Sequence, residues 1–402
     1  MQSIRPSRRT KTSTPRRRAH VALLIETSIA SGRDILRGIA RYVREHESWA
    51  LYHEPHGWNE SLPRWLRQWK GDGIIARVYT PGMAEQIAAC GIPVVDVLGA
   101  VPRLPFPLVH VDNNAIARMA AEHLVERGLR HFGFFGIKGQ NWSEQRYAEF
   151  CAAVASLQRK PCEVPLYELS FNAARTRSWE RVENKLARWI AALPKPTGVL
   201  VCSDQRGPLF LEACRRAEIS VPDEVAVIGV DNDEPLCEVC DPALSSIQAN
   251  HTRVGYQAAA VLADLMQGSP APKKAVLVEP QQTIARLSTD MLAIDDPYIT
   301  AALRLIREQV HTGNLRVDTI AHTVGLSRSV LERRFRTSLK RSVQREIIAA
   351  KIKRARELLI KTDLTLAMVA ERAGFKHQEY MGAVFKARLG ETPAKVRRQS
   401  KM

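Results

Sequence analysis

Between residues 21 and 285 the sequence alternates short β-branched runs with longer amphipathic ones. The run HVALLIE is followed by GRDILRGIARYVREH, and the alternation continues through GDGIIARV, HFGFFGI, TGVLVCSD and VAVIGVDND. Apolar runs of strand length that alternate with helical patterns predict βαβ units, in which helices cover both faces of a parallel sheet. This stretch is too long for one open sheet, so we expect an α/β domain of two lobes.

The alternation ends near TIARLSTDMLAIDDP, and the sequence beyond it shows helical patterns without a β-rich run. Asp295, Asp296 and Pro297 are typical of a linker that ends one domain and caps the first helix of the next. We therefore expect four parts along the chain. They are a basic disordered tail over 1–20, the two-lobed α/β domain over 21–285, a linker over 286–297 and an all-α domain over 298–402.

Charge is distributed unevenly along the chain, whose formal net charge is +17. Residues 1–20 carry seven basic residues and no acidic one, residues 300–402 carry 23 basic and nine acidic ones, and the middle is weakly acidic. Clustered cations bind polyanions by displacing counterions from a phosphate backbone. A nucleic acid is the expected partner of the C-terminal part, and a solvated basic surface is the alternative.

The sequence also argues against several other classes of protein. No apolar run approaches the roughly 18 residues of a membrane span, so we expect a cytoplasmic protein with no membrane partner. Seven widely spaced cysteines favour reduced thiols. Cys237 and Cys240 form a C-x-x-C pair, but no second pair follows at zinc-ligand spacing, and the glycine motifs of nucleotide sites do not occur. We expect no metal and no cofactor.

An A-x3-G pattern occurs twice in the basic C-terminal part. One copy contains Ala321 and Gly325, and the other contains Ala370 and Gly374. A small alanine lets two helices cross closely, and a glycine permits the left-handed turn between them. Each copy therefore has the spacing of a helix-turn-helix unit.

The residues around the two copies complete such units. Leu331 and Tyr380, six residues past the two glycines, are expected to pack the second helix on the first. Between the copies, SVQREIIAAKIKRARELLI predicts one long amphipathic helix that holds two units side by side. Their second helices would then enter major-groove surfaces about one turn, roughly 34 Å, apart.

The stretch from about 300 to 398 resembles the AraC-type DNA-binding domain, through the two copies and through AGF, FK, Gly390 and the Thr392-Pro393 pair. Arg333 has the donors that guanine binds, and Glu332 can accept from cytosine, while a solvated helix face is the alternative. Gly382 and Ala383 stand where the family often has larger polar residues, so weaker reading by the second unit is expected. The resemblance implies base-reading roles for Ser329, Glu332, Arg333, Gln378, Glu379 and Ala383.

Residues 21–285 resemble the periplasmic-binding-protein-like effector domains of LacI-type regulators. With the AraC-type part, and with SRSVLERRF, GYQAA, ALSSI and RLSTD, they resemble the xylose operon regulators over nearly the whole chain. The resemblance implies an activator of xylose-use genes, with D-xylose as effector and double-stranded operator DNA as partner. We also expect a homodimer. A regulator that responds to another pentose or a small polyol is the alternative.

Four residues are expected to bind the sugar. Asp204 ends TGVLVCSD and Asp231 ends VAVIGVD, and ligands bind at the carboxyl ends of parallel strands. Trp142 and Arg146 follow HFGFFGI and add an aromatic face and a fork of hydrogen-bond donors. Helix capping by the carboxylates and packing of a hinge by Trp142 are the alternatives.

Two other functions remain open. Asp204 and Asp231 are the residue type of the acid and base of a glycosidase, but such an enzyme would not need a basic tandem helix-turn-helix domain. A purely architectural nucleic-acid binder would use the middle domain only as a dimerisation scaffold. We therefore expect a sugar-responsive regulator rather than an enzyme.

Overall fold

The computed structural model describes residues 17–54, 62–170, 179–291, 296–313, 315–339, 341–362 and 364–400. It divides into two compact units, and the division falls between Met291 and Leu292. The basic tail expected over 1–20 lies outside the described residues as far as residue 16.

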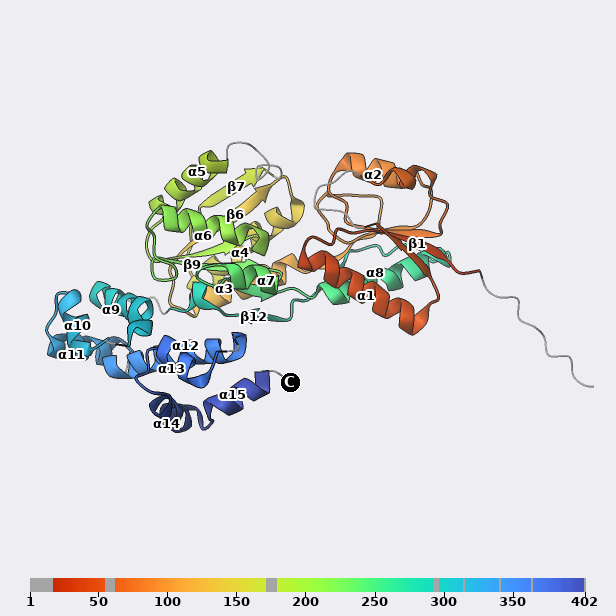
Figure 1. Cartoon of the computed structure of the whole chain (residues 1–402). Coiled ribbons are helices and arrows are strands. Elements are labelled where there is room, and N and C mark those ends of the chain that lie inside the picture. The colour runs from red at the N-terminus through yellow and green to blue at the C-terminus, as the bar shows by residue number, and fades with distance from the viewer. Residues whose placement is uncertain are drawn as a thin grey trace, which may run out of the picture. The chain divides into compact units, whose positions relative to one another are not determined.

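Lobe 1 of the first unit is built on a parallel sheet with the strand order β2-β1-β3-β4. Figure 1 labels β1 of this sheet together with the helices α1, α2 and α8. Next to it, β5 and β11 form a parallel pair, and Asp96 bridges from β4 to Leu108. Helix α8 packs on one face together with α1, while α2 and the 3-10 helix η1 cover the other. The elements are β1 (His20–Leu24), α1 (Ala30–His46), β2 (Ala50–His53), η1 (Arg64–Gln68), β3 (Gly73–Ala76), α2 (Pro81–Ala88), β4 (Val94–Asp96), β5 (Val109–Val111), α8 (His251–Met266) and β11 (Val276–Val278).

Lobe 2 has a six-stranded sheet with the order β12-β10-β9-β8-β6-β7. Every pairing in it is parallel except that between β10 and β12, so the expected two-lobed α/β architecture is confirmed. Its elements are α3 (Asn113–Val125), β6 (His131–Lys138), α4 (Asn141–Gln158), β7 (Leu166–Ser170), α5 (Trp179–Ala192), β8 (Thr197–Val201), η3 (Asp204–Arg206), α6 (Gly207–Arg216), β9 (Val225–Val230), α7 (Glu234–Val239), β10 (Ser245–Gln248) and β12 (Gln282–Ile284).

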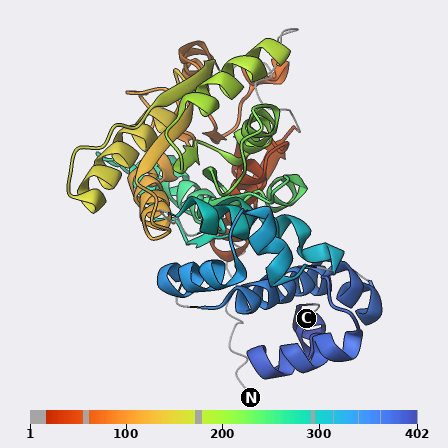
Figure 2. The ribbon, with the colours of Figure 1, turned by 90° about the vertical axis from the view of Figure 1, so that its left-hand side faces the viewer.

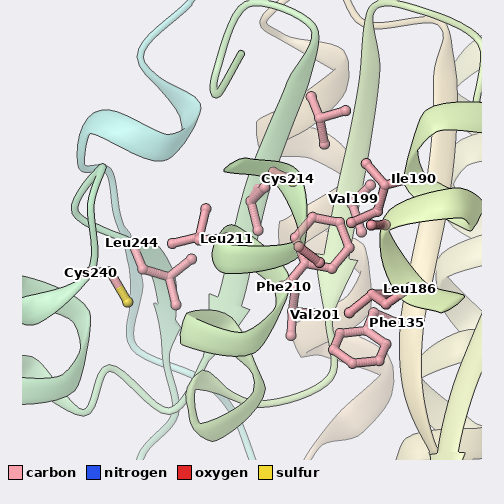
Figure 3. Packing of buried hydrophobic residues seen from close by; sticks show 14 of the residues in the cluster. Phe135, Leu186, Ile190, Val199, Val201, Phe210, Leu211, Cys214, Cys240 and Leu244 are labelled. Carbon is pink, nitrogen blue, oxygen red and sulfur yellow. The ribbon is translucent and has the colours of Figure 1, made fainter. Parts of the chain in front are cut away.

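The core of lobe 2 explains why its strands lack hydrophobic alternation. Every residue of β8 and β9 is buried, because helices cover both faces of the sheet. On one face, Phe135 and Val201 pack with Leu186 of α5 and Phe210 of α6 (Figure 3). On the other face, the ring of Phe150 in α4 contacts aromatic rings of β6.

The chain passes between the two lobes three times. It crosses after β5 into α3, after β10 into α8, and after β11 into β12. Helix α3 packs on β9, β10 and β12, whereas α8 packs on β3, β4 and β5. The lobes are therefore joined by three short segments.

The segment after β12 is held within lobe 2 by a polar cluster, here named the η4 clamp. It surrounds the 3-10 helix η4 (Leu287–Thr289), in which Ser288 and Thr289 are fully buried. The Ser288 hydroxyl accepts a hydrogen bond from the backbone N of Ser245 at 2.8 Å, and the Thr289 hydroxyl lies 2.8 Å from Nε2 of His123. The linker expected from residue 286 therefore begins later, because these residues satisfy polar groups inside lobe 2.

The second unit is entirely helical in its described residues (Figure 2, blue). Asp296 caps its first helix as expected, because Oδ1 accepts hydrogen bonds from the backbone N of Tyr298 and Ile299. Helix α12 packs Val343 into one core and Leu359 into a second one, so the expected helix that holds two units is confirmed. The helices are α9 (Pro297–Gln309), η5 (Val310–Thr312), α10 (Val317–Thr323), α11 (Arg328–Leu339), α12 (Val343–Lys361), α13 (Leu366–Arg372), α14 (Gln378–Leu389) and α15 (Pro393–Ser400).

The two A-x3-G patterns form the same turn. Gly325 and Gly374 have φ values of +74° and +79°, in the left-handed region that glycine favours. In the first copy, the backbone N of Leu326 donates a hydrogen bond to the carbonyl O of Ala321 at 2.9 Å. In the second copy, the backbone N of Phe375 donates to the carbonyl O of Ala370 at 2.8 Å. These are the bonds of a Schellman helix end, and the predicted turns are confirmed.

The packing role predicted for Tyr380 is wrong. Leu331 is fully buried as expected, but Tyr380 is 49% exposed, and Met381 takes the buried position. The reason is a turn that is one residue longer in the second copy, where α14 starts four residues after its glycine and α11 starts three residues after Gly325. None of the described helices of the chain is both long and apolar enough to span a bilayer.

Candidate ligand pocket and nucleic-acid interface

A pocket opens between the two lobes of the first unit, at the carboxyl ends of the strands. It contains about 470 Å³ of empty space, including the part that is open to solvent. Its polar side chains come from both lobes and from the first residue of α8, so a bound molecule would contact both lobes. They are Ser31, Arg77, Tyr79 and His110 of lobe 1, Trp142, Arg146, Ser203, Gln205 and Asp231 of lobe 2, and His251 of α8.

Asp231 presents an ionised carboxylate to this pocket. It directly follows β9 with a φ of +106°, and its Oδ1 accepts a hydrogen bond from Nε2 of His251 at 2.8 Å. Burial acts to raise the pKa of Asp231, but His251 and the more distant Arg146 and Arg77 outweigh burial and hold that pKa below its ordinary value. The carboxylate therefore stays charged and can accept hydrogen bonds from ligand hydroxyls.

Arg146 and Trp142 lie together in the pocket wall. The Arg146 guanidinium is 5.0 Å from the centre of the Trp142 ring, and both side chains are buried. Arg146 Nε donates to Oδ1 of Asn113 at 3.0 Å, and its Nη1 donates to the carbonyl O of Cys202. Burial lowers the pKa of Arg146 against the opposing effect of Asp231. The two contacts hold the guanidinium in one orientation beside an aromatic face.

Lobe 1 contributes a second buried arginine. Arg77 directly follows β3, and its Nη1 lies 3.2 Å from Oε1 of Glu26 and donates to the Ser31 hydroxyl at 2.9 Å. The Tyr79 hydroxyl donates to the same carboxylate oxygen. Burial acts to lower the pKa of Arg77, but Glu26 and other nearby acidic groups raise it overall. This charge is thus balanced inside lobe 1.

Asp204 lies outside the pocket, although its neighbours Ser203 and Gln205 line it. Its carboxylate is fully buried and accepts hydrogen bonds from the Ser246 hydroxyl at 2.8 Å and from the backbone N of Asp233 at 2.9 Å. Burial and the charge of Asp231 raise its pKa to about 8. Only one carboxylate of the predicted pair therefore faces the pocket.

The residues expected to read bases lie on two exposed helix faces. On α11, Ser329, Glu332 and Arg333 line one shallow concave surface together with Arg336 and Thr337. On α14, the expected residues Gln378, Glu379 and Ala383 are all exposed. Because the turn before α14 is one residue longer, Gly382 and Ala383 occupy the places that Glu332 and Arg333 have on α11. At these two places, the first surface therefore has hydrogen-bonding side chains and the second has a glycine and an alanine.

Comparison with family models divides the chain in the same way. Residues 20–111 match the model of a XylR N-terminal domain, residues 121–289 match that of a periplasmic binding protein-like domain, and residues 320–399 match that of a helix-turn-helix domain.

Two relatives match this chain over almost its full length. The xylose operon regulatory protein of Escherichia coli strain K12 is 31% identical over 95% of this chain and 97% of its own. The protein of the same name from Haemophilus influenzae is 30% identical over 94% of this chain. The chain belongs to the family of xylose operon regulatory proteins. It is thus a transcription regulator with a helix-turn-helix DNA-binding domain.

Solved structures agree with this family assignment. The structure of the xylose-binding transcription activator xylR matches this chain with a TM-score of 0.80 and 29% sequence identity. The match covers 95% of this chain and 98% of that one. A LacI family regulator from Mycobacterium smegmatis, at 20% identity and a TM-score of 0.53 over 68% of this chain, shares the fold of the first unit.

Arg77, His110 and His251 are among the pocket residues that the sequence did not reveal. Arg77 was within reach, because it follows β3 just as Asp231 follows β9. His110 lies within the three-residue strand β5, and His251 is the first residue of α8. No spacing in the sequence links these two histidines to the pocket, because they reach it only through the packing of the lobes.

Proposed function

We propose that this chain is a D-xylose-responsive transcription activator that works in the cytoplasm as a homodimer. The sugar binds in the pocket between the lobes through Asp231, Arg146 and Trp142. Operator DNA is read by Ser329, Glu332 and Arg333 of α11, and more weakly by Gln378, Glu379 and Ala383 of α14. Sugar binding repositions the paired DNA-binding units on two half-sites.

The observation that carries the proposal is the convergence of Asp231, Arg146 and Trp142 on one pocket between the lobes. A carboxylate, a guanidinium and an indole provide acceptors, donors and an apolar face, which together suit the hydroxyls and C–H groups of a small sugar. The relatives described as xylose operon regulatory proteins, and the related structure described as xylose-binding, support xylose as that sugar.

The Asp231→Asn variant is expected to lose about tenfold to a hundredfold in D-xylose affinity. A hydrogen bond to a charged group contributes about 1.5–3 kcal/mol, and the amide removes that charge. Titration calorimetry on the full-length chain measures the effect. Asp204→Asn is the matched control, because this carboxyl group also follows a strand but is fully buried outside the pocket. The xylose affinity of this variant is expected to stay within about threefold.

Other results of this titration would count against the proposal. Equal losses of xylose affinity in Asp231→Asn and Asp204→Asn would mean that the sugar binds closer to Asp204 than the proposed pocket lies. No heat from the unmodified chain with xylose, but heat with arabinose or ribose, would change the effector. Turnover of a xyloside would favour an enzyme.

The Arg333→Ala variant is expected to weaken binding to operator DNA by about 1–3 kcal/mol relative to random DNA, because a bidentate contact with guanine is lost. Gel-shift titration against both DNAs measures the difference. Arg356→Ala is the control, since this exposed arginine lies on α12, outside the two reading helices. It is expected to weaken binding to both DNAs alike.

DNase footprints with and without xylose test the dimer and its response. Two protected half-sites whose joint occupancy depends on the sugar are expected. A ligand shifts such an equilibrium only by its differential affinity for the two arrangements, so a footprint that is identical in saturating xylose would refute the coupling.

A further inference from the structure

His110 in the pocket wall has one ring nitrogen without a partner. It lies on β5, is 5% exposed and lines the pocket. Its Nδ1 lies 3.3 Å from the carbonyl O of Val97. Because a carbonyl oxygen only accepts hydrogen bonds, Nδ1 carries the ring proton and Nε2 is an acceptor. This Nε2 is buried and has no hydrogen-bond partner among the described residues.

The imidazole of His110 is also kept neutral. Burial lowers its pKa well below the ordinary value, and the charges of Arg146, His251 and Arg77 lower it further. A neutral ring with its proton on Nδ1 keeps the lone pair of Nε2 available at ordinary pH.

Arg77, in the wall of the same pocket, has the complementary deficit. Its Nη1 is occupied by Ser31 and Glu26, but its Nε is buried and has no acceptor among the residues that the structure describes. Buried polar groups in folded proteins are nearly always hydrogen-bonded. Two side chains in the wall of one pocket therefore each hold a buried polar atom without a partner among the described residues, an acceptor on His110 and a donor on Arg77.

We infer that His110 Nε2 and Arg77 Nε form a hydroxyl-binding subsite, in which a sugar hydroxyl donates to the imidazole and accepts from the guanidinium. The inference rests on the proposed function, because it assigns further recognition residues to the same sugar site. A hydroxyl suits both atoms, since it is a donor and an acceptor at once. A carboxylate has no hydrogen to give Nε2, and an ammonium has no lone pair for Nε.

Two substitutions of His110 separate its two nitrogens. In His110→Asn, the side-chain amide can still donate to the Val97 carbonyl, but nothing replaces Nε2. In His110→Gln, the longer side chain brings an amide oxygen to the region of Nε2. His251 is a poorer probe, because its Nε2 binds the Asp231 carboxylate and any substitution there disturbs that contact.

The test is a calorimetric titration of the full-length chain and both variants with D-xylose and each of its monodeoxy analogues. The asparagine variant is expected to bind xylose about tenfold to a hundredfold more weakly, and the glutamine variant within about fivefold of the unmodified chain. One monodeoxy analogue should bind the unmodified chain and the asparagine variant equally, because the hydroxyl that meets His110 is already absent from it.

The subsite is wrong if xylose binds the unmodified chain and the asparagine variant equally. It is also wrong if both variants lose the same factor in affinity for xylose and for every analogue, because that result indicates a structural role. If another neutral pentose binds in place of xylose and shows the same dependence on residue 110, the effector was misassigned and the subsite stands. If no neutral sugar binds the unmodified chain, both the subsite and the proposed function fail.

Discussion

The Gly374→Ala variant is expected to lose most of the stability of the C-terminal unit, whereas Gly325→Ala is expected to lose only about 1–2 kcal/mol. Both glycines have left-handed φ values, which cost an alanine about 1–2 kcal/mol. At Gly374 an added Cβ would also lie 1.9 Å from the carbonyl O of Val310, whereas at Gly325 it would meet nothing within 4 Å. Because the obstacle is backbone, η5 must move, and we expect a loss above about 4 kcal/mol.

Urea unfolding of the full-length chain distinguishes the two variants. All seven tryptophans precede residue 190, so tryptophan fluorescence reports on the first unit, while far-UV circular dichroism reports on both units. For Gly374→Ala, we expect the helical signal of the second unit to disappear at much lower urea and operator binding to be lost, with an unchanged fluorescence transition. Equal shifts in the two variants would show that Gly374 has no special contact.

The Asp204→Ala variant is expected to destabilise lobe 2 by about 2–5 kcal/mol. The carboxyl group connects the start of η3 to β10 through Ser246, and to the N-cap residue of α7 through the backbone N of Asp233. Each buried group that loses its partner costs about 1–3 kcal/mol. Fluorescence-monitored urea unfolding at pH 7 measures this loss. A stability equal to that of the unmodified chain would mean that water replaces the carboxyl group without cost.

The raised pKa of Asp204 predicts the direction in which the stability of the folded chain changes with pH. The pKa of Asp204 is raised to about 8 in the folded chain, against about 3.9 for an unfolded aspartate. Between these values the folded chain holds a proton that the unfolded chain releases, so this group makes the protein less stable as pH rises from about 4 to 8. Asp204→Asn cannot titrate and is expected to flatten the decline. An equally steep decline in this variant would contradict the raised pKa.

Asp204 and Asp231 show how far the sequence predicts the site. Both follow an apolar strand, and the rule for parallel sheets predicts the pocket for both. The rule holds for Asp231, but the carboxylate of Asp204 is occupied by Ser246 and by Asp233, which are far from it in the chain. Periodicity and strand ends locate the edge of the sheet, whereas the orientation of each side chain depends on partners that sequence spacing does not reveal.

The C-terminal helical unit shows the same limit on prediction from sequence. The A-x3-G pattern predicts both turns, the long helix between them and the burial of Leu331, because these depend on local backbone preferences. It fails at Tyr380 because one additional residue in the turn rotates α14 by one position. His110 and Arg77 come together only through the pairing and packing of strands, and no local pattern marks that subsite.

The η4 clamp decides which lobe carries the DNA-binding unit. Ser288 and Thr289 are buried, and η4 packs on β9 and β10, so the chain leaves the first unit from lobe 2. Lobe 1 therefore has no covalent connection of its own to the C-terminal unit. Under the proposed function, closure of lobe 1 on a sugar would leave this covalent connection unchanged. In the proposed homodimer, the second copy would provide the reference against which the motion is registered. Sensitivity to the ligand would then be a property of the pair, and a monomeric form is expected to bind sugar without a change in DNA binding.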